Sequence, residues 1–208
     1  MNARHAHPRL VVIGNGMAGM RTVEELLKLA PDMYRITVFG AEPHGNYNRI
    51  LLSPVLAGEK TVDDIMLNTR EWYDANGITL HAGDPVVRID RKKRVVHAAS
   101  GLAVPYDRLL IATGSKPFIV PVPGHQLPGV IGFRDISDVD TMLAAARAGG
   151  KAVVIGGGLL GLEAANGLLR QGMEVAVVHV TGSLMNQQLD PPAAELLRAS
   201  LERRGLRI

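Results

Sequence analysis

The sequence of 208 residues contains no cysteine. This absence excludes disulfides, thiolate zinc sites and cysteine-ligated iron–sulfur clusters within the chain. It also excludes a redox-active cysteine pair that could pass electrons onward. Any electron that leaves a cofactor bound here must therefore go directly to a substrate or to another domain.

Aromatic residues make up only 4% of the sequence, which is too few to build a surface on which nucleic-acid bases stack. The formal net charge is +3 and the isoelectric point is near 9.4, but the basic residues are spread along the chain. The one basic run, "RKKR" at 91–94, separates two β-type stretches and predicts a solvated hairpin turn. We therefore expect no nucleic-acid partner.

The sequence also lacks a sustained apolar stretch long enough to cross a bilayer, so we expect no membrane span. Its start, residues 1–9, is basic but polar and too short for a secretory signal. We interpret it as the flexible N-terminus of a cytoplasmic protein. The seven histidines are scattered without the spacing of a metal site, so we expect no metal.

What the sequence does contain is nearly the same glycine loop twice, "VVIGNGMAG" at 11–19 and "VVIGGGLLG" at 153–161. Each loop follows a run of β-branched residues and precedes a helical pattern, the context in which G-x-G-x-x-G is informative. The first glycine permits a tight turn, the second lets the main chain approach a pyrophosphate, and the third lets helix and strand pack closely. These glycines are Gly14, Gly16 and Gly19 in the first loop, and Gly156, Gly158 and Gly161 in the second.

Each loop begins a complete β-α-β unit, because apolar residues recur at helical spacing after it and a further strand follows, at 35–40 and at 174–180. A helix N-terminus presents unpaired N–H groups and the positive end of the helix dipole, which favour phosphate. Two units in one chain therefore predict two dinucleotide sites. For either loop taken alone, a glycine-rich strand–helix turn is the alternative.

The stretch between the loops is predicted from turn residues and apolar runs. Residues 43–59, rich in Pro, Gly and Asn, begin as a loop. The expected elements after it are a helix over 68–77, a strand over 78–84, a hairpin over 85–99, an apolar strand over 109–112, a proline-rich linker over 117–129, and helices over 135–150 and 192–204. "LRI" at 206–208 is interpreted as the opening of a further strand.

The fold class predicted is α/β. We expect a flexible N-terminus over 1–9, a Rossmann-like domain over 10–118, a linker and connecting helix over 119–149, and the incomplete start of a second Rossmann-like domain over 150–208. A parallel sheet needs several strands with both faces covered to bury its apolar surface, so we expect this second domain to be truncated. An unusually small natural domain is the alternative.

The sequence resembles the two-dinucleotide flavoprotein reductases, most closely the N-terminal part of the large subunit of NAD(P)H-dependent nitrite reductases. The stretches that carry the resemblance are "GNGMAG" (14–19), "FGAEPHGNYNRILLSPVLAGE" (39–59), "YDRLLIATGS" (106–115), "GGGLLGLEAA" (156–165) and "VVHVTGSLMNQQLD" (177–190). Rubredoxin and ferredoxin reductases are similar, but they often have a lysine near the position of Pro54.

The resemblance implies that the first loop holds FAD and the second NAD(P)H. For FAD it implies Gly14, Asn15, Gly16, Met17, Ala18, Gly19, Glu42, Arg49, Val86, Ala112, Thr113, Gly114 and Arg134. For NAD(P)H it implies Gly156, Gly158, Leu159, Leu160, Gly161 and Glu163. The alternatives are a solvated loop side chain for Glu42, surface charges for the two arginines, and simple stabilisation of a helix N-terminus by Glu163.

His179 is a further candidate, because it stands 23 residues after Gly156. In an NAD-specific unit the second strand commonly ends in an acid that binds the ribose hydroxyls and repels a 2′-phosphate. Without that repulsive element we expect weak discrimination between NADH and NADPH. The alternative is that His179 points into the sheet and contacts neither cofactor.

The function implied is an electron-entry module in which NAD(P)H reduces FAD. The acceptor would be an iron–sulfur and sirohaem domain or a separate electron-acceptor protein, absent from this chain, and the module could form a homodimer. No side-chain nucleophile or acid is needed, so we predict no catalytic residue. The alternatives are a rubredoxin- or ferredoxin-type NAD(P)H reductase and a non-catalytic FAD- or nucleotide-binding fragment.

Overall fold

The computed structural model describes residues 7–208, so the first six residues of the predicted flexible N-terminus lie outside the described residues. The chain forms two compact units. The first runs to Asn48 and resumes over Met66–Ser115, and the second contains Arg49–Ile65 and Lys116–Ile208. Residues 49–65, predicted as part of the first domain, are therefore grouped with the second unit.

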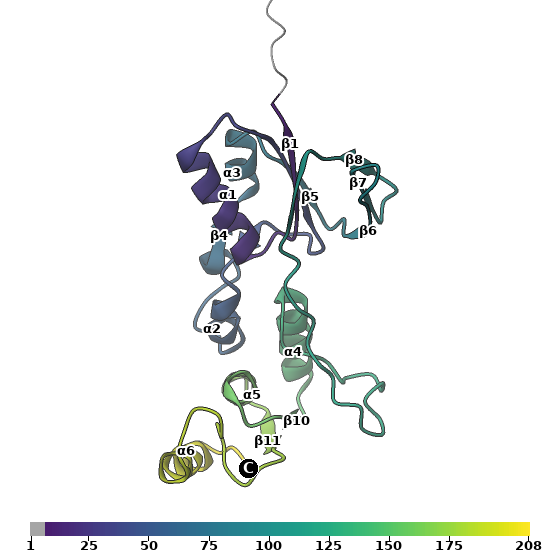
Figure 1. Cartoon of the computed structure of the whole chain (residues 1–208). Coiled ribbons are helices and arrows are strands. Elements are labelled where there is room, and N and C mark those ends of the chain that lie inside the picture. Colours follow the sequence, from purple (N-terminus) through teal and green to yellow (C-terminus); the bar gives the residue numbers. More distant parts are fainter. Residues whose placement is uncertain (1–6) are drawn as a thin grey trace, which may run out of the picture. The chain divides into compact units, whose positions relative to one another are not determined.

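The first unit is built on a four-stranded parallel sheet in the order β5-β2-β1-β9. Figure 1 labels β1 and β5 of this sheet. Its strands are β1 (Arg9–Ile13), β2 (Arg35–Gly40), β5 (Thr79–Ala82) and β9 (Arg108–Ile111). Strand β1 lies between β2 and β9, with Val12 opposite Val38 and Leu110. This central position explains its unbroken apolar run, because a parallel strand is buried on both faces.

The two faces of this sheet are covered by different elements. Helices α1 (Met17–Leu29) and α3 (Arg70–Ala75) cover one face. The antiparallel sheet of β6 (Val86–Asp90), β7 (Val95–Ala98) and β8 (Ala103–Pro105) covers the other. The helical face buries Leu10, Val12, Met20, Val23, Ile36, Val38, Tyr73 and Ile78, and the opposite face buries Val11, Ile13, Phe39, Val96, Ala98 and Tyr106.

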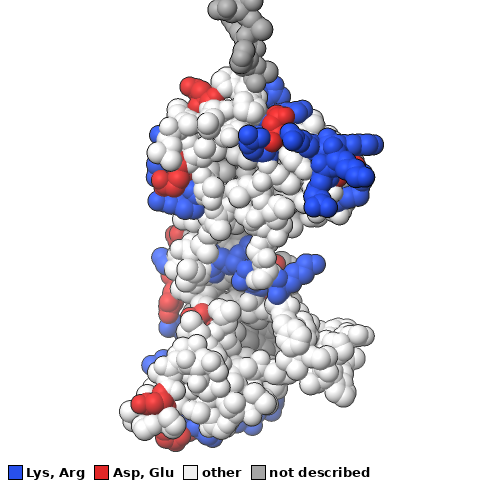
Figure 2. Space-filling model, viewed as in Figure 1, with Lys and Arg blue, Asp and Glu red and all other residues white. Residues whose placement is uncertain are grey.

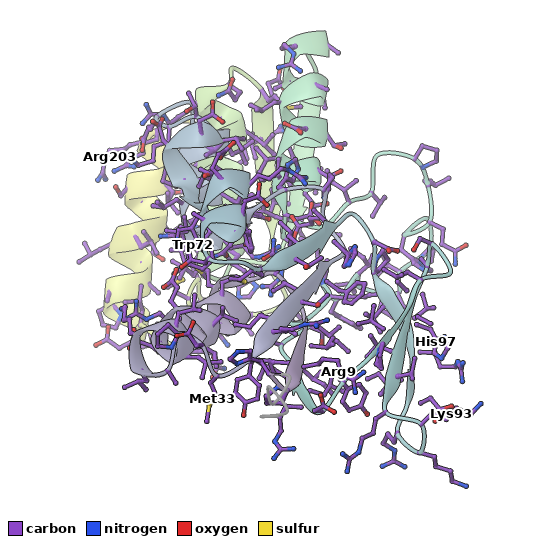
Figure 3. All side chains as sticks on the ribbon, turned by 90° about the horizontal axis from the view of Figure 1, so that it is seen from above. Arg9, Met33, Trp72, Lys93, His97 and Arg203 are labelled. Carbon is purple, nitrogen blue, oxygen red and sulfur yellow. The ribbon has the colours of Figure 1, made fainter. Side chains whose placement is uncertain are left out.

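The predicted hairpin over 85–99 is confirmed as the antiparallel pair β6–β7, and the basic run 91–94 forms its exposed turn. Figure 2 shows Lys and Arg side chains gathered on this part of the first unit, and Figure 3 shows Lys93 at the tip of the hairpin. A short antiparallel pair, β3 (Asn46–Tyr47) and β4 (Met66–Asn68), completes the unit.

The second unit has β10 (Lys151–Ile155) and β11 (Glu174–Val178) as a parallel pair, with α5 (Leu159–Arg170) between them in the chain. Helices α4 (Ile136–Ala148) and α6 (Pro191–Arg203) begin at aspartate N-caps, Asp135 and Asp190, whose side chains accept main-chain N–H bonds. The predicted strand opening at 206–208 is present as a parallel bridge between Arg207 and Ala176.

The stretch predicted to begin as a loop at 43–59 contains a 3-10 turn, η1 (Arg49–Leu51), and helix α2 (Leu52–Leu56). A second 3-10 turn, η2 (Asp63–Ile65), follows. Helix α2 packs against α5 where Gly167 leaves no Cβ, since a Cβ there would lie 2.7 Å from Leu56 Cγ. Among the described residues, we find no helix with the length and apolar character needed to cross a membrane.

Candidate functional site

The first glycine loop makes a close turn between β1 and α1 in which two glycines are required by space. Gly14 has φ +113°, and a Cβ on it would collide with the main-chain oxygen of Ala112. A Cβ on Gly19 would lie 2.7 Å from the main-chain oxygen of Gly14. The first and third glycines of the motif are therefore needed for the turn and for helix–strand packing.

The second glycine of this loop faces open space. An ideal Cβ on Gly16 would meet no atom within 4 Å, and within the described part of the chain no side chain caps the start of α1. The N–H groups of this helix end therefore remain available, and the first turn of α1 contains no acidic residue. This is the arrangement that a pyrophosphate requires at a helix N-terminus.

Other residues predicted for FAD lie around the same edge of the first unit. The Ala112 N–H donates to the Ile13 main-chain oxygen at 2.8 Å, so the end of β9 lies beside the end of β1, where the loop begins. Glu42 follows β2, and its Oε2 accepts a 2.6 Å hydrogen bond from the Tyr47 hydroxyl. Val86 begins β6 just after Asp84, whose N–H donates to the Gly40 main-chain oxygen.

The second loop repeats the backbone geometry of the first. The Gly14 N–H donates to the Phe39 main-chain oxygen and the Gly156 N–H donates to the Val178 main-chain oxygen, both at 2.8 Å. A Cβ on Gly161 would collide with the Gly156 main-chain oxygen, whereas a Cβ on Gly158 would again face open space. The start of α5 likewise has no side-chain cap from any residue the structure describes. Leu159 and Leu160, predicted for NAD(P)H, are exposed.

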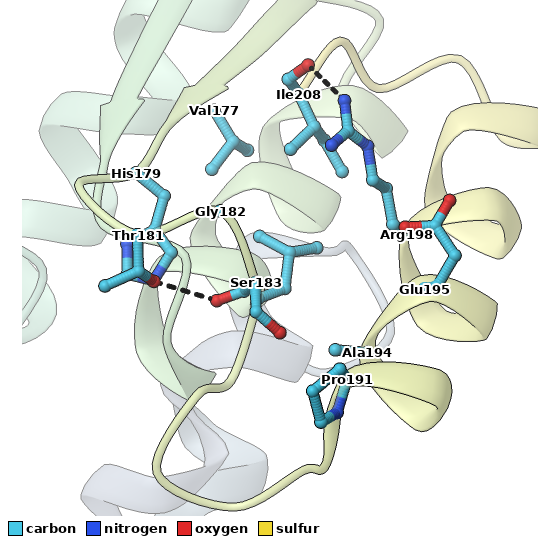
Figure 4. A pocket seen from close by; sticks show the side chains of 11 residues that line it. Val177, His179, Thr181, Gly182, Ser183, Pro191, Ala194, Glu195, Arg198 and Ile208 are labelled. Carbon is cyan, nitrogen blue, oxygen red and sulfur yellow. Dashed lines mark hydrogen bonds between the residues drawn. The ribbon is translucent and has the colours of Figure 1, made fainter.

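The His179 side chain contacts the main chain of the second loop. Its Nδ1 accepts the Gly157 N–H at 3.1 Å, so a neutral ring carries its proton on Nε2. Nε2 is buried and has no hydrogen-bond partner in the described residues, and a Cβ on Gly157 would lie 2.9 Å from the ring. The ring also lines a cavity of about 330 Å³ between β11 and α6, together with Ser183, Arg198 and Ile208 (Figure 4).

Thr113 and Gly114 follow β9 in the first unit, whereas Arg49, Arg134 and Glu163 lie in the second unit. Arg49 Nη1 donates to the Arg134 main-chain oxygen at 2.9 Å. Glu163, in the second turn of α5, accepts a 2.5 Å hydrogen bond from the Ser53 hydroxyl at its Oε2. Glu163, which the resemblance assigns to NAD(P)H, is thus held by a side chain from α2.

Four residues around these loops were not found by sequence reasoning: Tyr47, Ser53, Tyr73 and Asn46. Each acts through a hydrogen bond to a predicted site residue or to a neighbour of one, and no spacing in the sequence signals such a pairing. Over the described range 7–208, no cluster of three His, Asp or Glu side chains could hold a metal ion.

Comparison with known proteins matches residues 8–208 to the family described as pyridine nucleotide-disulphide oxidoreductases. The chain is 53% identical to the NAD(P)H nitrite reductase of Bacillus subtilis (strain 168), over 95% of this chain and 25% of that protein. It is 52% identical to the assimilatory nitrate reductase electron transfer subunit of the same organism, over 95% of this chain and 26% of the relative.

The chain thus spans about a quarter of the length of these curated relatives. Among solved structures, NADH:rubredoxin oxidoreductase from Clostridium acetobutylicum has a TM-score of 0.86 and 27% identity, covering 97% of this chain and 52% of that one. The predicted α/β fold with Rossmann-like units is confirmed by these matches.

Proposed function

The chain belongs to the pyridine nucleotide-disulphide oxidoreductase family, and on this basis we propose that it is the electron-entry part of an NAD(P)H-dependent flavoprotein. Proteins of this family bind FAD and NAD(P)H. The first loop, 14–19, holds FAD in this proposal, and the second, 156–161, holds NAD(P)H. The name of the family includes a disulphide, but this sequence has no cysteine, so no disulfide within it takes part.

The observation that carries the proposal is the open space at the second glycine of each loop. Gly16 and Gly158 are the residues whose missing Cβ leaves room for a pyrophosphate, and both precede helices without side-chain caps among the described residues. By contrast, α4 and α6 begin at aspartate caps, so among the four longest helices described only α1 and α5 begin without a side-chain cap.

When bound, the nicotinamide supplies a hydride that the flavin accepts, so the protein has to position the two cofactors and shape their surroundings. The N–H groups of α1 and α5 balance the charge of the phosphates. Glu42, oriented by the Tyr47 hydroxyl, would accept hydrogen bonds from the hydroxyls of the FAD adenosine ribose. Ser53 holds one oxygen of Glu163 in a fixed direction.

The acceptor of the electrons lies outside this chain in our proposal. The relatives of 52–53% identity are named for nitrite reduction and for electron transfer to nitrate reductase, which supports an iron–sulfur and sirohaem domain or a separate acceptor protein as the next centre. The rubredoxin reductase likeness, at 27% identity, favours a protein acceptor as the second candidate. The expected cytoplasmic location, possible homodimer and domain boundaries stay predictions.

Two reciprocal variants test the proposal, because a Cβ at Gly16 or Gly158 would meet no protein atom within 4 Å and we therefore expect both valine variants to fold. We expect Gly16→Val to abolish FAD binding and to retain NADH binding, and Gly158→Val to do the reverse. Flavin fluorescence and nucleotide fluorescence measure the two affinities. In the parent, NADH should bleach the absorbance of bound flavin. Bound flavin that NADH does not bleach would instead support a non-catalytic binding module, and full FAD affinity in Gly16→Val would contradict the loop assignment.

A further inference from the structure

Asn15, the residue between the first two glycines of the first loop, has both ends of its side chain occupied by the protein. Its Nδ2 donates to the main-chain oxygen of His44 at 3.1 Å, and its Oδ1 accepts from the Tyr73 hydroxyl at 2.6 Å. The side chain also packs over the end of β2, since a Cβ on Gly40 would lie 2.9 Å from Asn15 Cβ. The Asn15 side chain therefore anchors the loop through one hydrogen bond at each of its polar atoms.

Tyr73 is the buried end of this anchor. The residue is 0% exposed, and its ring packs edge-on against Trp72 on α3. Burial raises the pKa of the Tyr73 hydroxyl to about 12, so the hydroxyl stays protonated and can donate to Asn15. The same oxygen accepts the Asn46 N–H at 3.2 Å, so the hydroxyl acts as donor and acceptor at once.

The chain of hydrogen bonds continues from Asn46 to the helix that the loop begins. Asn46 Nδ2 donates to Asn68 Oδ1 at 2.8 Å, and Asn68 Nδ2 donates to Glu24 Oε1 on α1 at 3.0 Å. Both asparagines are 2% exposed. The network thus contacts the loop at Asn15 and the middle of the α1 helix at Glu24, so it joins both to Tyr73 on α3.

This network is costly in free energy compared with an apolar core. Burying amide groups carries a desolvation penalty, and Asn46 Oδ1 is buried with no hydrogen-bond partner in the described structure. Apolar side chains of similar size would fill the same space without that penalty. What the polar groups add is a directional constraint on Asn15, which an apolar contact could not supply.

The second loop has a comparable constraint at the equivalent position. There the residue between the first two glycines is Gly157, and its main-chain N–H is held by His179 Nδ1. The two loops share their sequence pattern and strand hydrogen bonds. The residue between the first two glycines is held by Tyr73 in the first loop and by His179 in the second. That position is thus restrained in both units.

We propose that Tyr73 is a positioning residue for the first dinucleotide loop, acting through Asn15 to hold residues 14–16 in the shape that receives the FAD pyrophosphate. This inference rests on the proposed function, because it assigns the loop to FAD. Tyr73 is fully buried, so it acts on the loop through its hydrogen bond to Asn15. It restricts the conformations of the loop before FAD binds. Less conformational entropy is therefore lost on binding, and the affinity for FAD is higher.

The test is a double-variant cycle on the full 208-residue chain. Tyr73→Phe removes only the hydroxyl, and Asn15→Ala removes its partner. Each single variant loses the Tyr73–Asn15 bond and one further bond, from the Asn46 N–H to the Tyr73 hydroxyl or from Asn15 Nδ2 to the His44 main-chain oxygen. We expect each to raise the Kd for FAD about threefold to tenfold, the effect of losing the shared bond. Because both act through one contact, the double variant should be no weaker than the worse single variant. Flavin fluorescence titration measures all four proteins.

Tyr34→Phe is the matched control, since Tyr34 packs against the same core cluster and should keep the parent's FAD affinity. A merely structural role would lower the stability of the cofactor-free protein in proportion to the loss of FAD affinity, and it would show no coupling to Asn15. Thermal unfolding of the cofactor-free proteins, together with their NADH affinity, therefore distinguishes such a role from the proposed one. If Tyr73→Phe does not fold, Asn15→Ala carries the test, because its side chain lies in a loop.

Two results would overturn the inference alone: FAD affinity in Tyr73→Phe or Asn15→Ala within the error of the parent, or effects of the two changes that add in the double variant. A parent chain that binds NADH but no FAD would overturn the proposed function of the first loop, and this inference with it. The two failures are distinguished by the parent's own titration.

Discussion

Ser53 on α2 and Glu163 on α5 are 110 residues apart in sequence and are joined by a 2.5 Å hydrogen bond from Ser53 Oγ to Glu163 Oε2. Two further contacts to the same segment lie at the C-terminal end of α5. Gln171 Nε2 donates to the Leu56 main-chain oxygen at 2.9 Å, and Arg170 pairs with Glu59 at 2.7 Å. Residues 49–65 are thus held against α5 by side-chain hydrogen bonds and an ion pair.

Ser53→Ala tests the hydrogen bond from Ser53 to Glu163. The change leaves the partly buried Glu163 carboxylate without its donor, and hydrogen bonds to charged groups contribute about 1.5–3 kcal/mol. We expect the free energy of unfolding to fall by about 1.5 kcal/mol, measured by urea denaturation. Ser137→Ala, on the exposed first turn of α4, is the control and should leave it unchanged. Equal unfolding midpoints for Ser53→Ala and the parent would show that the bond adds nothing to stability.

Gly167→Ala tests the close crossing of α5 and α2, where Gly167 lies against Leu56. Alanine inside a helix is normally about 1 kcal/mol more favourable than glycine. Here the added Cβ would lie 2.7 Å from Leu56 Cγ and 3.2 Å from Leu56 Cβ, so we expect destabilisation instead. In a Leu56→Ala background the space is open, and the same change should become neutral or stabilising. Thermal unfolding of the four proteins decides; the same sign in both backgrounds would argue against a tight crossing.

Local patterns in the sequence predicted most of the elements and both glycine loops. The strand over 35–40 and the helix over 192–204, found at 191–203, follow from apolar runs and flanking turn residues. The open space at Gly16 and Gly158 agrees with the motif, because a G-x-G-x-x-G loop is specified by consecutive residues. The roles of the individual site residues remain predictions.

The rest could not be predicted, because it depends on pairs of residues far apart in the chain. The Tyr73–Asn15 bond spans 58 residues and the Gly157–His179 bond 22 residues, and neither has a periodic signal. The same holds for α2, a helix of five residues, whose packing on α5 accounts for its place in the second unit. Strand β8, only three residues long, was missed for lack of an alternating pattern.

Asp107 gives a prediction of pH dependence. Its Oδ2 accepts hydrogen bonds from Arg9 Nε and from the Arg9 main-chain N–H at 2.9 and 2.7 Å, which joins the starts of β1 and β9. These bonds, the side-chain one foremost, hold the pKa of the Asp107 carboxyl well below its usual range. A lowered pKa in the folded state stabilises the fold above the unfolded-state pKa of about 3.9 and loses that effect as pH falls below it.

We therefore expect Asp107→Asn to lower the Tm of the chain at pH 7, and the gap from the parent to close between about pH 4 and pH 2. Thermal unfolding by circular dichroism across this range provides the measurement. Asp140→Asn, an exposed aspartate on α4, serves as the control for a general change of charge. A gap that stays constant down to pH 2 would remove the ionised pair as its cause.

The choice between NADH and NADPH is expected to depend on His179, which stands just after β11 and holds the Gly157 N–H. The parent has no acid at this position, so we expect the Kd values for the two reduced nucleotides to lie within about tenfold of each other. His179→Glu supplies a carboxylate that can still accept the Gly157 N–H but repels a 2′-phosphate. With the value for two charges about 4 Å apart in water as a lower bound, this repulsion is worth on the order of 1 kcal/mol, a several-fold weakening of NADPH binding alone.

His179→Gln is the matched variant that separates charge from loop support, because its amide oxygen can accept the same N–H without a negative charge. We expect Gln to keep the parent's ratio of NADPH to NADH affinity and Glu to lower it about fivefold, as measured by fluorescence titration with each nucleotide. If Glu and Gln change both affinities equally, His179 acts only on the shape of the loop. If neither changes anything, the adenosine ribose binds away from the end of β11.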